Sequence, residues 1–180
     1  MSYIVMKNEG IKTFGLEERL FLAFSIIAIS ASLLASMINL FLELWIPLII
    51  AFSVLLAQGF IYYLVRYRGW FKAGVIASII IVNLLLAVNF FFNAGLAGPS
   101  LLYLCATFYF SVTVAPMRHT VFWLLANMVL VGVLGILSYS NPDLVVSYYE
   151  NSQGYLIDML LSYYVIVAII FVGTIYIRRL

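Results

Sequence analysis

The sequence is poor in charged residues. Asp, Glu, Lys and Arg make up 9% of its 180 residues, whereas a soluble domain carries roughly 25%. It holds one cysteine, Cys105, which excludes an intramolecular disulfide, and one histidine, His119, which excludes the paired axial histidines of a membrane haem. Its Cys, His and carboxylate residues have no metal-ligand spacing. We therefore predict no metal site and no cofactor, and we expect Cys105 to be a small buried apolar residue.

Signatures of catalysis are also absent. The sequence contains no HExxH or GxSxG pattern and no phosphate-binding GxxxxGKS or GxxxxGKT pattern. No lysine lies deep within an apolar run, which excludes a retinal Schiff base, and the single histidine lies at the end of a run rather than beside an intramembrane serine. We predict that this chain by itself is not an enzyme, and nothing in it indicates binding to nucleic acid.

Long apolar runs account for most of the chain, since 66% of the residues are hydrophobic. An α-helix of about 20 apolar residues crosses a hydrocarbon core of about 30 Å. Six such runs are separated by charged or turn-forming residues, and Pro99 and Pro116 bracket the short fourth run. The sequence therefore predicts an all-α integral membrane protein, a bundle of six transmembrane helices. The predicted helices are 20–40, 44–65, 71–92, 100–115, 120–138 and 155–177.

The first run also has a weaker interpretation as a cleaved signal peptide, because basic residues precede it. It is longer than the 7 to 15 apolar residues of a typical signal peptide core, and a tail of 19 residues comes before it. We therefore expect residues 1–19 to be a cytoplasmic tail and the first run to be a retained helix.

The distribution of charge predicts the orientation. In a six-helix arrangement, all nine Lys and Arg residues fall on one side of the membrane, and short basic loops stay in the cytoplasm. We therefore predict that both termini are cytoplasmic. The other side receives only acidic residues, which are Glu43, Asp143, Glu150 and Asp158.

Polar residues inside the runs are mostly neutral, and we expect them to form hydrogen bonds between packed helices. A series of small residues on the first run, from Ala23 to Ser36, predicts a helix-packing face. A transporter remains an alternative, although no run is interrupted at its middle by glycine and proline. The neutral polar residues that we expect to form hydrogen bonds between packed helices are Asn39, Gln58, Asn83, Asn89 and Asn127.

Two connections on the acidic side carry turn signals. Residues 89–100, NFFFNAGLAGPS, predict a tight turn with Gly95 and Gly98 followed by the start of a helix at Pro99. In the longer connection, residues 141–143 form a turn signal, and we expect residues 144–149 to form a short amphipathic helix at the membrane surface.

These segments resemble a known family. The pattern NAGLAGPSLLYL at 93–104, PMRHTVFWLLAN at 116–127, and NPDLV at 141–145 followed by paired tyrosines is similar to the six-span N-terminal membrane domain of a family of bacterial sensor histidine kinases. The resemblance covers about residues 15–180. It implies that the chain lies in the inner membrane of a bacterium and that residues 178–180 begin a cytoplasmic linker. It implies that the last helix continues into a dimerising cytoplasmic module with a phosphoacceptor histidine and an ATP-binding kinase part, which passes the signal to a response regulator.

The resemblance leaves the output module outside these 180 residues, since the chain holds no phosphoacceptor region or ATP-binding motif. Relatives often have a basic residue shortly before the aspartate of the sixth helix. Gln153 and Gly154 occupy that neighbourhood here, so an acid–base pair is not inferred. The implied partners are the lipid bilayer, a second copy of the chain and a response regulator.

The resulting hypothesis is a sensory domain whose outer residues perceive a cation, a small polar ligand or the outer membrane surface. Three alternatives stay open: the acidic loop reflects topology alone, its tyrosines are interfacial anchors, and Asp158 caps or hydrogen-bonds near the start of its helix. Arg178 and Arg179 would begin the segment that carries the signal to the cytoplasmic output module. The candidate sensing residues are Asn93, Asn141, Asp143, Tyr148, Tyr149, Glu150 and Asp158.

Overall fold

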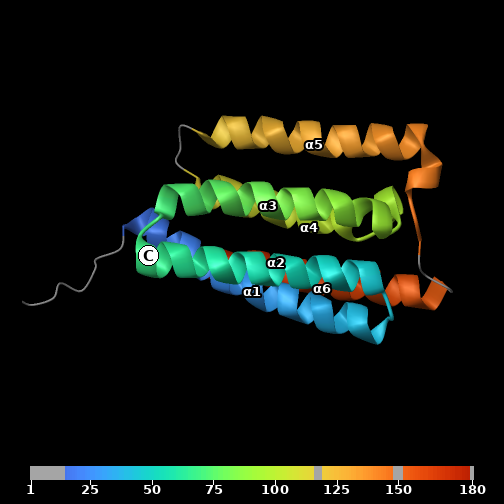
Figure 1. Ribbon diagram of the computed structural model, residues 1–180, viewed down its shortest axis with the longest axis horizontal. Helices are drawn as coiled ribbons and strands as arrows, with labels where there is room; N and C mark the ends of the chain where they lie inside the picture. Colours follow the sequence, from blue (N-terminus) through green and yellow to red (C-terminus); the bar gives the residue numbers. More distant parts are fainter. Residues whose placement is uncertain (1–14, 116–118, 148–151, 179–180) are drawn as a thin grey trace, which may run out of the picture.

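The structure, a computed structural model, describes residues 15–115, 119–147 and 152–178 as a bundle of α-helices that run alternately up and down (Figure 1). The described residues form no β-strand. Short π- and 3₁₀-helical segments, η1 (Leu64–Arg68), η2 (Gly95–Ala97) and η4 (Pro142–Leu144), lie in the connections. The α-helices are α1 (Leu16–Phe41), α2 (Trp45–Tyr63), α3 (Phe71–Phe92), α4 (Ser100–Val114), α5 (Thr120–Ser140) and α6 (Ser152–Arg178).

Within these ranges, five helices are long and apolar enough to cross a membrane. They are α1, α2 with η1, α3, α5 and α6, and they give the chain the architecture of a multi-pass membrane protein. Helix α4 has 15 residues, a length of about 22 Å, which is less than the roughly 30 Å of a hydrocarbon core. It nevertheless packs against α1, α3, α5 and α6 in the interior of the bundle.

The observed helix bounds follow the predicted apolar runs, with differences at the ends. The third helix matches its predicted range, whereas the first begins at Leu16 rather than at residue 20. Glu17 and Glu18 lie in the first turn of α1, where the helix dipole favours negative charge. Part of the predicted tail is therefore helical, and residues 1–14 lie outside the described ranges.

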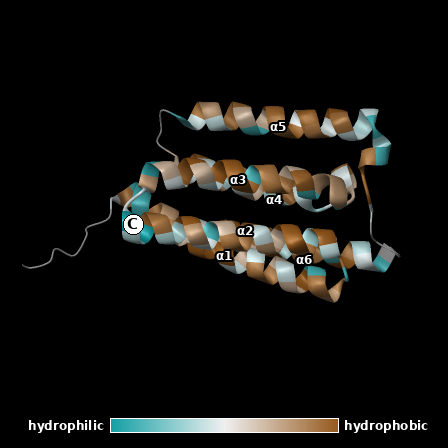
Figure 2. Cartoon of the chain, viewed as in Figure 1, coloured by the Kyte–Doolittle hydropathy of each residue, from teal (hydrophilic) through white to brown (hydrophobic). Residues whose placement is uncertain are grey.

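The bundle has two chemically different ends, and we name each end after the chain segments that lie there. The terminal end is where α1 begins and α6 ends, and the loop end holds the connections α1–α2, α3–α4 and α5–α6 (Figure 1). The hydrophilic residues gather at these two ends (Figure 2). The described arginines and Lys72 lie at the terminal end, and Glu43 and Asp143 lie at the loop end.

At the loop end, the predicted tight turn between α3 and α4 is confirmed. Gly95 has a positive φ of 57°, which glycine adopts without strain. A Cβ at Gly98 would collide with the main-chain carbonyl oxygen of Asn93. The Tyr155 hydroxyl of α6 donates to the Ala97 carbonyl oxygen over 2.7 Å and so attaches α6 to this turn.

The expected short helix over residues 144–149 is wrong for the part that the structure describes. Residues 145–147 are not helical, because their main chain pairs with the end of α3. The Val146 amide donates to the Phe91 carbonyl oxygen (2.8 Å), and the Ala94 amide donates to the Val146 carbonyl oxygen (3.2 Å). These bonds satisfy main-chain groups that an isolated surface helix would leave to water. Residues 148 and 149 lie outside the described ranges.

The apolar core is densest in the terminal half of the bundle. Phe21 and Phe24 of α1 contact Phe110 of α4 with ring centroids 6.1 and 5.6 Å apart, and Phe21 also meets Phe71 of α3 edge-on. Val65, just after α2, is fully buried beside them. A smaller cluster around Phe90 joins α3, α4 and α5 near the loop end.

Candidate functional site

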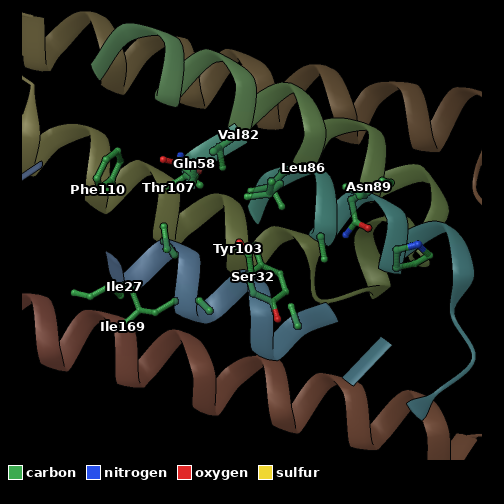
Figure 3. Close-up of a pocket in the computed structure, with 18 of the residues that line it drawn as sticks. Ile27, Ser32, Gln58, Val82, Leu86, Asn89, Tyr103, Thr107, Phe110 and Ile169 are labelled. Carbon is green, nitrogen blue, oxygen red and sulfur yellow. The ribbon is translucent and has the colours of Figure 1, made fainter. Parts of the chain in front are cut away.

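A partly open cavity of about 140 Å³ lies between helices α1, α2, α3, α4 and α6. Its lining residues extend along α1 from Phe24 to Asn39, a stretch of about 22 Å at 1.5 Å per residue. Figure 3 shows side chains from several helices converging on it. Most of the lining is apolar, and Asn39, Gln58, Asn89 and Asp158 are among its polar members. Such a mostly apolar pocket with a few polar groups is the usual form of a small-molecule site.

Small side chains on α1 leave room for this cavity. Ala28, Ser32 and Ala35 belong to the small-residue series that we interpreted as a packing face, and Ala31 lies between them. Helix α1 makes its most extensive contact with α2, and the role of the small residues in that contact stays a prediction. The same stripe also lines the cavity, where a small residue gives space rather than close helix contact.

The terminal-end floor of the cavity is formed by Phe24 and Phe110. Beyond them lie Phe21, Val65 and Val114, each with none of its surface exposed. Because protein interiors of this kind are closely packed, this aromatic layer is the terminal-end limit of the cavity. The half of the cavity next to it is called the deeper half.

A hydrogen-bonded pair, Gln58 and Ser78, joins α2 to α3 in the deeper half of the cavity. The Gln58 Nε2 atom donates to the Ser78 Oγ atom over 2.6 Å, and both residues are buried. The Gln58 Oε1 atom is also buried and meets no hydrogen-bond donor in the described part of the chain. An unsatisfied buried acceptor costs about 1 to 3 kcal/mol, so this oxygen marks a point where a partner would be favourable.

A second polar group joins α4 to α6. The Tyr103 hydroxyl donates to the Ser162 Oγ atom over 3.1 Å, and the Ser162 hydroxyl donates to the Asp158 Oδ1 atom over 3.4 Å. Asp158 is 3% exposed, and both it and Tyr103 line the cavity. This arrangement brings an ionisable group of the last helix to the cavity wall.

The position of Asp158 in its helix narrows the alternatives for this residue. Helix α6 begins at Ser152, so Asp158 lies beyond the first turn, and helix-dipole effects fall off within that turn. Stabilisation by the helix dipole is therefore weak at Asp158, whereas hydrogen bonding is confirmed through Ser162.

The predicted sensing residues are divided by the structure. Asn93 and Asp158 line the same cavity and are buried. Asn141 and Asp143 are exposed on the α5–α6 connection and are not among the residues that line the cavity. Arg178 is exposed at the end of α6. Tyr148, Tyr149, Glu150 and Arg179 lie outside the described residues.

Several cavity residues did not enter the predicted site. Gln58 and Asn89 were interpreted only as helix-packing residues, and their bonds to Ser78 and Ser100 confirm that part. Their polarity within apolar helices was the available signal. Tyr103 carried no comparable signal, because a tyrosine in a membrane helix usually indicates an interfacial anchor.

The prediction for Cys105 has an outcome here. Cys105 is exposed on α4, so the expectation that it is buried is wrong. Its side chain lies on the side of α4 away from the cavity-lining residues Tyr103 and Ala106. In residues 15–115, 119–147 and 152–178, no three His, Cys, Asp or Glu residues are grouped to hold a metal ion.

Comparison with known proteins gave no match to a protein family, to a curated protein or to a solved structure.

Proposed function

We propose that this chain is the membrane-embedded sensory domain of a bacterial receptor, the N-terminal part of a sensor histidine kinase. The observation that carries the proposal is the position of Asp158. It belongs to the last helix, α6, and it lines a cavity formed mainly by other helices. A ligand or stimulus that changes the cavity would therefore act directly on the helix that leads out of the bundle.

The rest of α6 is suited to carry such a change. Toward the terminal end, the Tyr109 hydroxyl of α4 and the Thr174 Oγ1 atom of α6 are hydrogen-bonded at 3.0 Å. A Cβ at Gly173 would lie 2.8 Å from ring atoms of Phe24, so α6 approaches α1 closely there. A stimulus shifts such a helix only through different affinities for its two positions.

The proposal includes six spans in the inner membrane with both ends of the chain in the cytoplasm. The described basic residues support this orientation, because Arg66, Arg68 and Lys72 accompany Arg19 and Arg178 at the terminal end. Helix α4 would be the fourth of these six spans, and it packs against α1, α3, α5 and α6 despite its short length. The cytoplasmic module would form a homodimer and transfer phosphate to a response regulator.

A small six-helix transporter is the second candidate. The observation that favours it is the cavity between the helices, which could hold a solute. The aromatic layer at Phe21, Phe24 and Phe110 counts against it, because a transport path needs to open at that end as well. Sealed vesicles that contain the chain would show saturable solute uptake if the transporter interpretation were right.

The test of the sensor proposal begins with the reading frame after the codon for Leu180. An in-frame phosphoacceptor histidine and kinase module support the proposal. In the full-length protein in lipid nanodiscs, Asp158→Asn should change basal autophosphorylation about fivefold or more, which is the usual range of coupling between two sites.

The matched control is Asp143→Asn, which removes the same charge from an exposed residue outside the cavity lining. It should leave basal autophosphorylation near the wild-type value. A stop codon after Leu180, or equal autophosphorylation in Asp158→Asn, Asp143→Asn and the wild type, would count against the sensor.

A further inference from the structure

The volume of the cavity limits the size of its ligand. An apolar cavity of about 150 Å³ holds one benzene molecule, and this cavity measures about 140 Å³. Around its deeper half, Val54, Val82 and Phe110 supply apolar walls. A molecule with a single ring or a short branched chain therefore fits the space beside Gln58.

Gln58 supplies a polar contact for a ligand in this cavity. It is 2% exposed, and it lines the cavity together with Val82, Thr107 and Phe110 (Figure 3). With Nε2 bonded to Ser78, the Oε1 atom needs a donor. If the amide is turned over, Ser78 donates to Oε1 and the Nε2 atom needs an acceptor. A hydroxyl group is both donor and acceptor, so it satisfies either orientation.

We infer that the cavity binds a small, uncharged, single-ring alcohol of the phenol class, with its hydroxyl on the Gln58 amide and its ring against Val54, Val82 and Phe110. An uncharged ligand is required in this deeper half, because bringing a charge to membrane depth is costly. The inference rests on the proposed function in one respect. If the chain is a sensory domain, this alcohol is the chemical class of the signal that it detects.

Binding is measured with the chain in lipid nanodiscs and two probes of similar size, 4-fluorophenol and 4-fluorotoluene, followed by their fluorine NMR signals. Empty nanodiscs give the background of partition into lipid. We expect saturable binding of 4-fluorophenol above this background. Gln58→Met keeps the side-chain size and removes the hydrogen bond, so it should weaken 4-fluorophenol about five- to tenfold and leave 4-fluorotoluene unchanged.

Ala31→Phe fills the cavity and should abolish binding of both probes. Its matched control is Leu34→Phe, which adds the same ring on the same helix at an exposed residue that does not line the cavity. Helix content by circular dichroism shows whether each variant folds. If Ala31→Phe does not fold, the comparison of the wild type with Gln58→Met decides the question.

Three results would overturn the inference. The first is the absence of saturable binding of 4-fluorophenol to the wild type, which is expected if a water molecule satisfies Gln58. The second is equal affinity of the wild type and Gln58→Met for 4-fluorophenol. The third is equal loss of binding in Ala31→Phe and Leu34→Phe. The assay uses no ATP and no cytoplasmic module, so its failure is distinguishable from failure of the sensor proposal.

Discussion

At the scale of single residues, two glycines show how the same residue type has different roles. Gly98 lies in the α3–α4 turn, where a Cβ would meet the Asn93 carbonyl group, whereas Gly132 lies on α5 with nothing within 4 Å of its Cβ position. The turn residues that surround Gly98 position Asn93 at the cavity. The sequence motif alone predicted a turn there, and the structure adds that the constraint is close approach of main-chain atoms.

We predict that Gly98→Ala destabilises the folded chain by about 1 to 3 kcal/mol, the usual cost of overpacking. Gly132→Ala should be neutral or stabilise by up to about 1 kcal/mol, because alanine favours the helix. The measurement is the midpoint of unfolding by SDS in mixed micelles. A Gly98→Ala midpoint equal to that of the wild type would mean that the turn rearranges at no cost.

Other residues mark the limit of what sequence can predict. Asn93 and Asp158 were identified because each is polar and next to a turn or a charged loop. Asn141 and Asp143 do not line the cavity with them. This difference depends on the path of the α5–α6 connection over the bundle, which no local sequence pattern encodes. The exposure of Cys105 likewise depends on the rotation of α4, and its apolar neighbours on both sides gave no direction.

At the scale of elements, helices were predictable because an apolar run of membrane length has few alternatives to a helix. The cavity was not predictable from the sequence. Its presence depends on which face of α1 meets α2 and on which part of that face α2 leaves uncovered. The sequence showed small residues, and small residues serve equally for close packing and for lining a space.

Helix α6 leads to a prediction at this scale. Gly173→Leu places a large side chain against Phe24, and interaxial distances between helices vary over about 2 Å with the side chains at the contact. We therefore expect the terminal end of α6 to move about 2 Å away from α1. Spin labels on Arg178→Cys and Arg19→Cys, in a Cys105→Ala background, report this movement by pulsed electron paramagnetic resonance.

The control for this movement is Val172→Leu, the adjacent residue, whose side chain is exposed. It should leave the label distance unchanged. If Gly173→Leu gives the wild-type distance, then Phe24 adapts in place, and α6 is not held at that point. The idea that α6 carries the signal by displacement would then lose its structural support.

At the scale of the whole molecule, charge and hydropathy are separated along one axis. Basic residues lie at the terminal end, and acidic residues of the connections lie at the loop end. The helices between the two ends are mostly apolar (Figure 2). This polarity agrees with the proposed orientation. Whether α4, at 15 residues, crosses the membrane determines on which side of it every later segment lies.

Single cysteines in a Cys105→Ala background test the proposed arrangement. A membrane-impermeant maleimide should label Ala97→Cys and Ser140→Cys in intact cells, because both residues are exposed at the loop end. Arg68→Cys and His119→Cys, at the terminal end, should react only after permeabilisation. If Ala97→Cys and His119→Cys react from the same side, α4 does not cross, and the proposed placement of α5, α6 and the output linker is wrong.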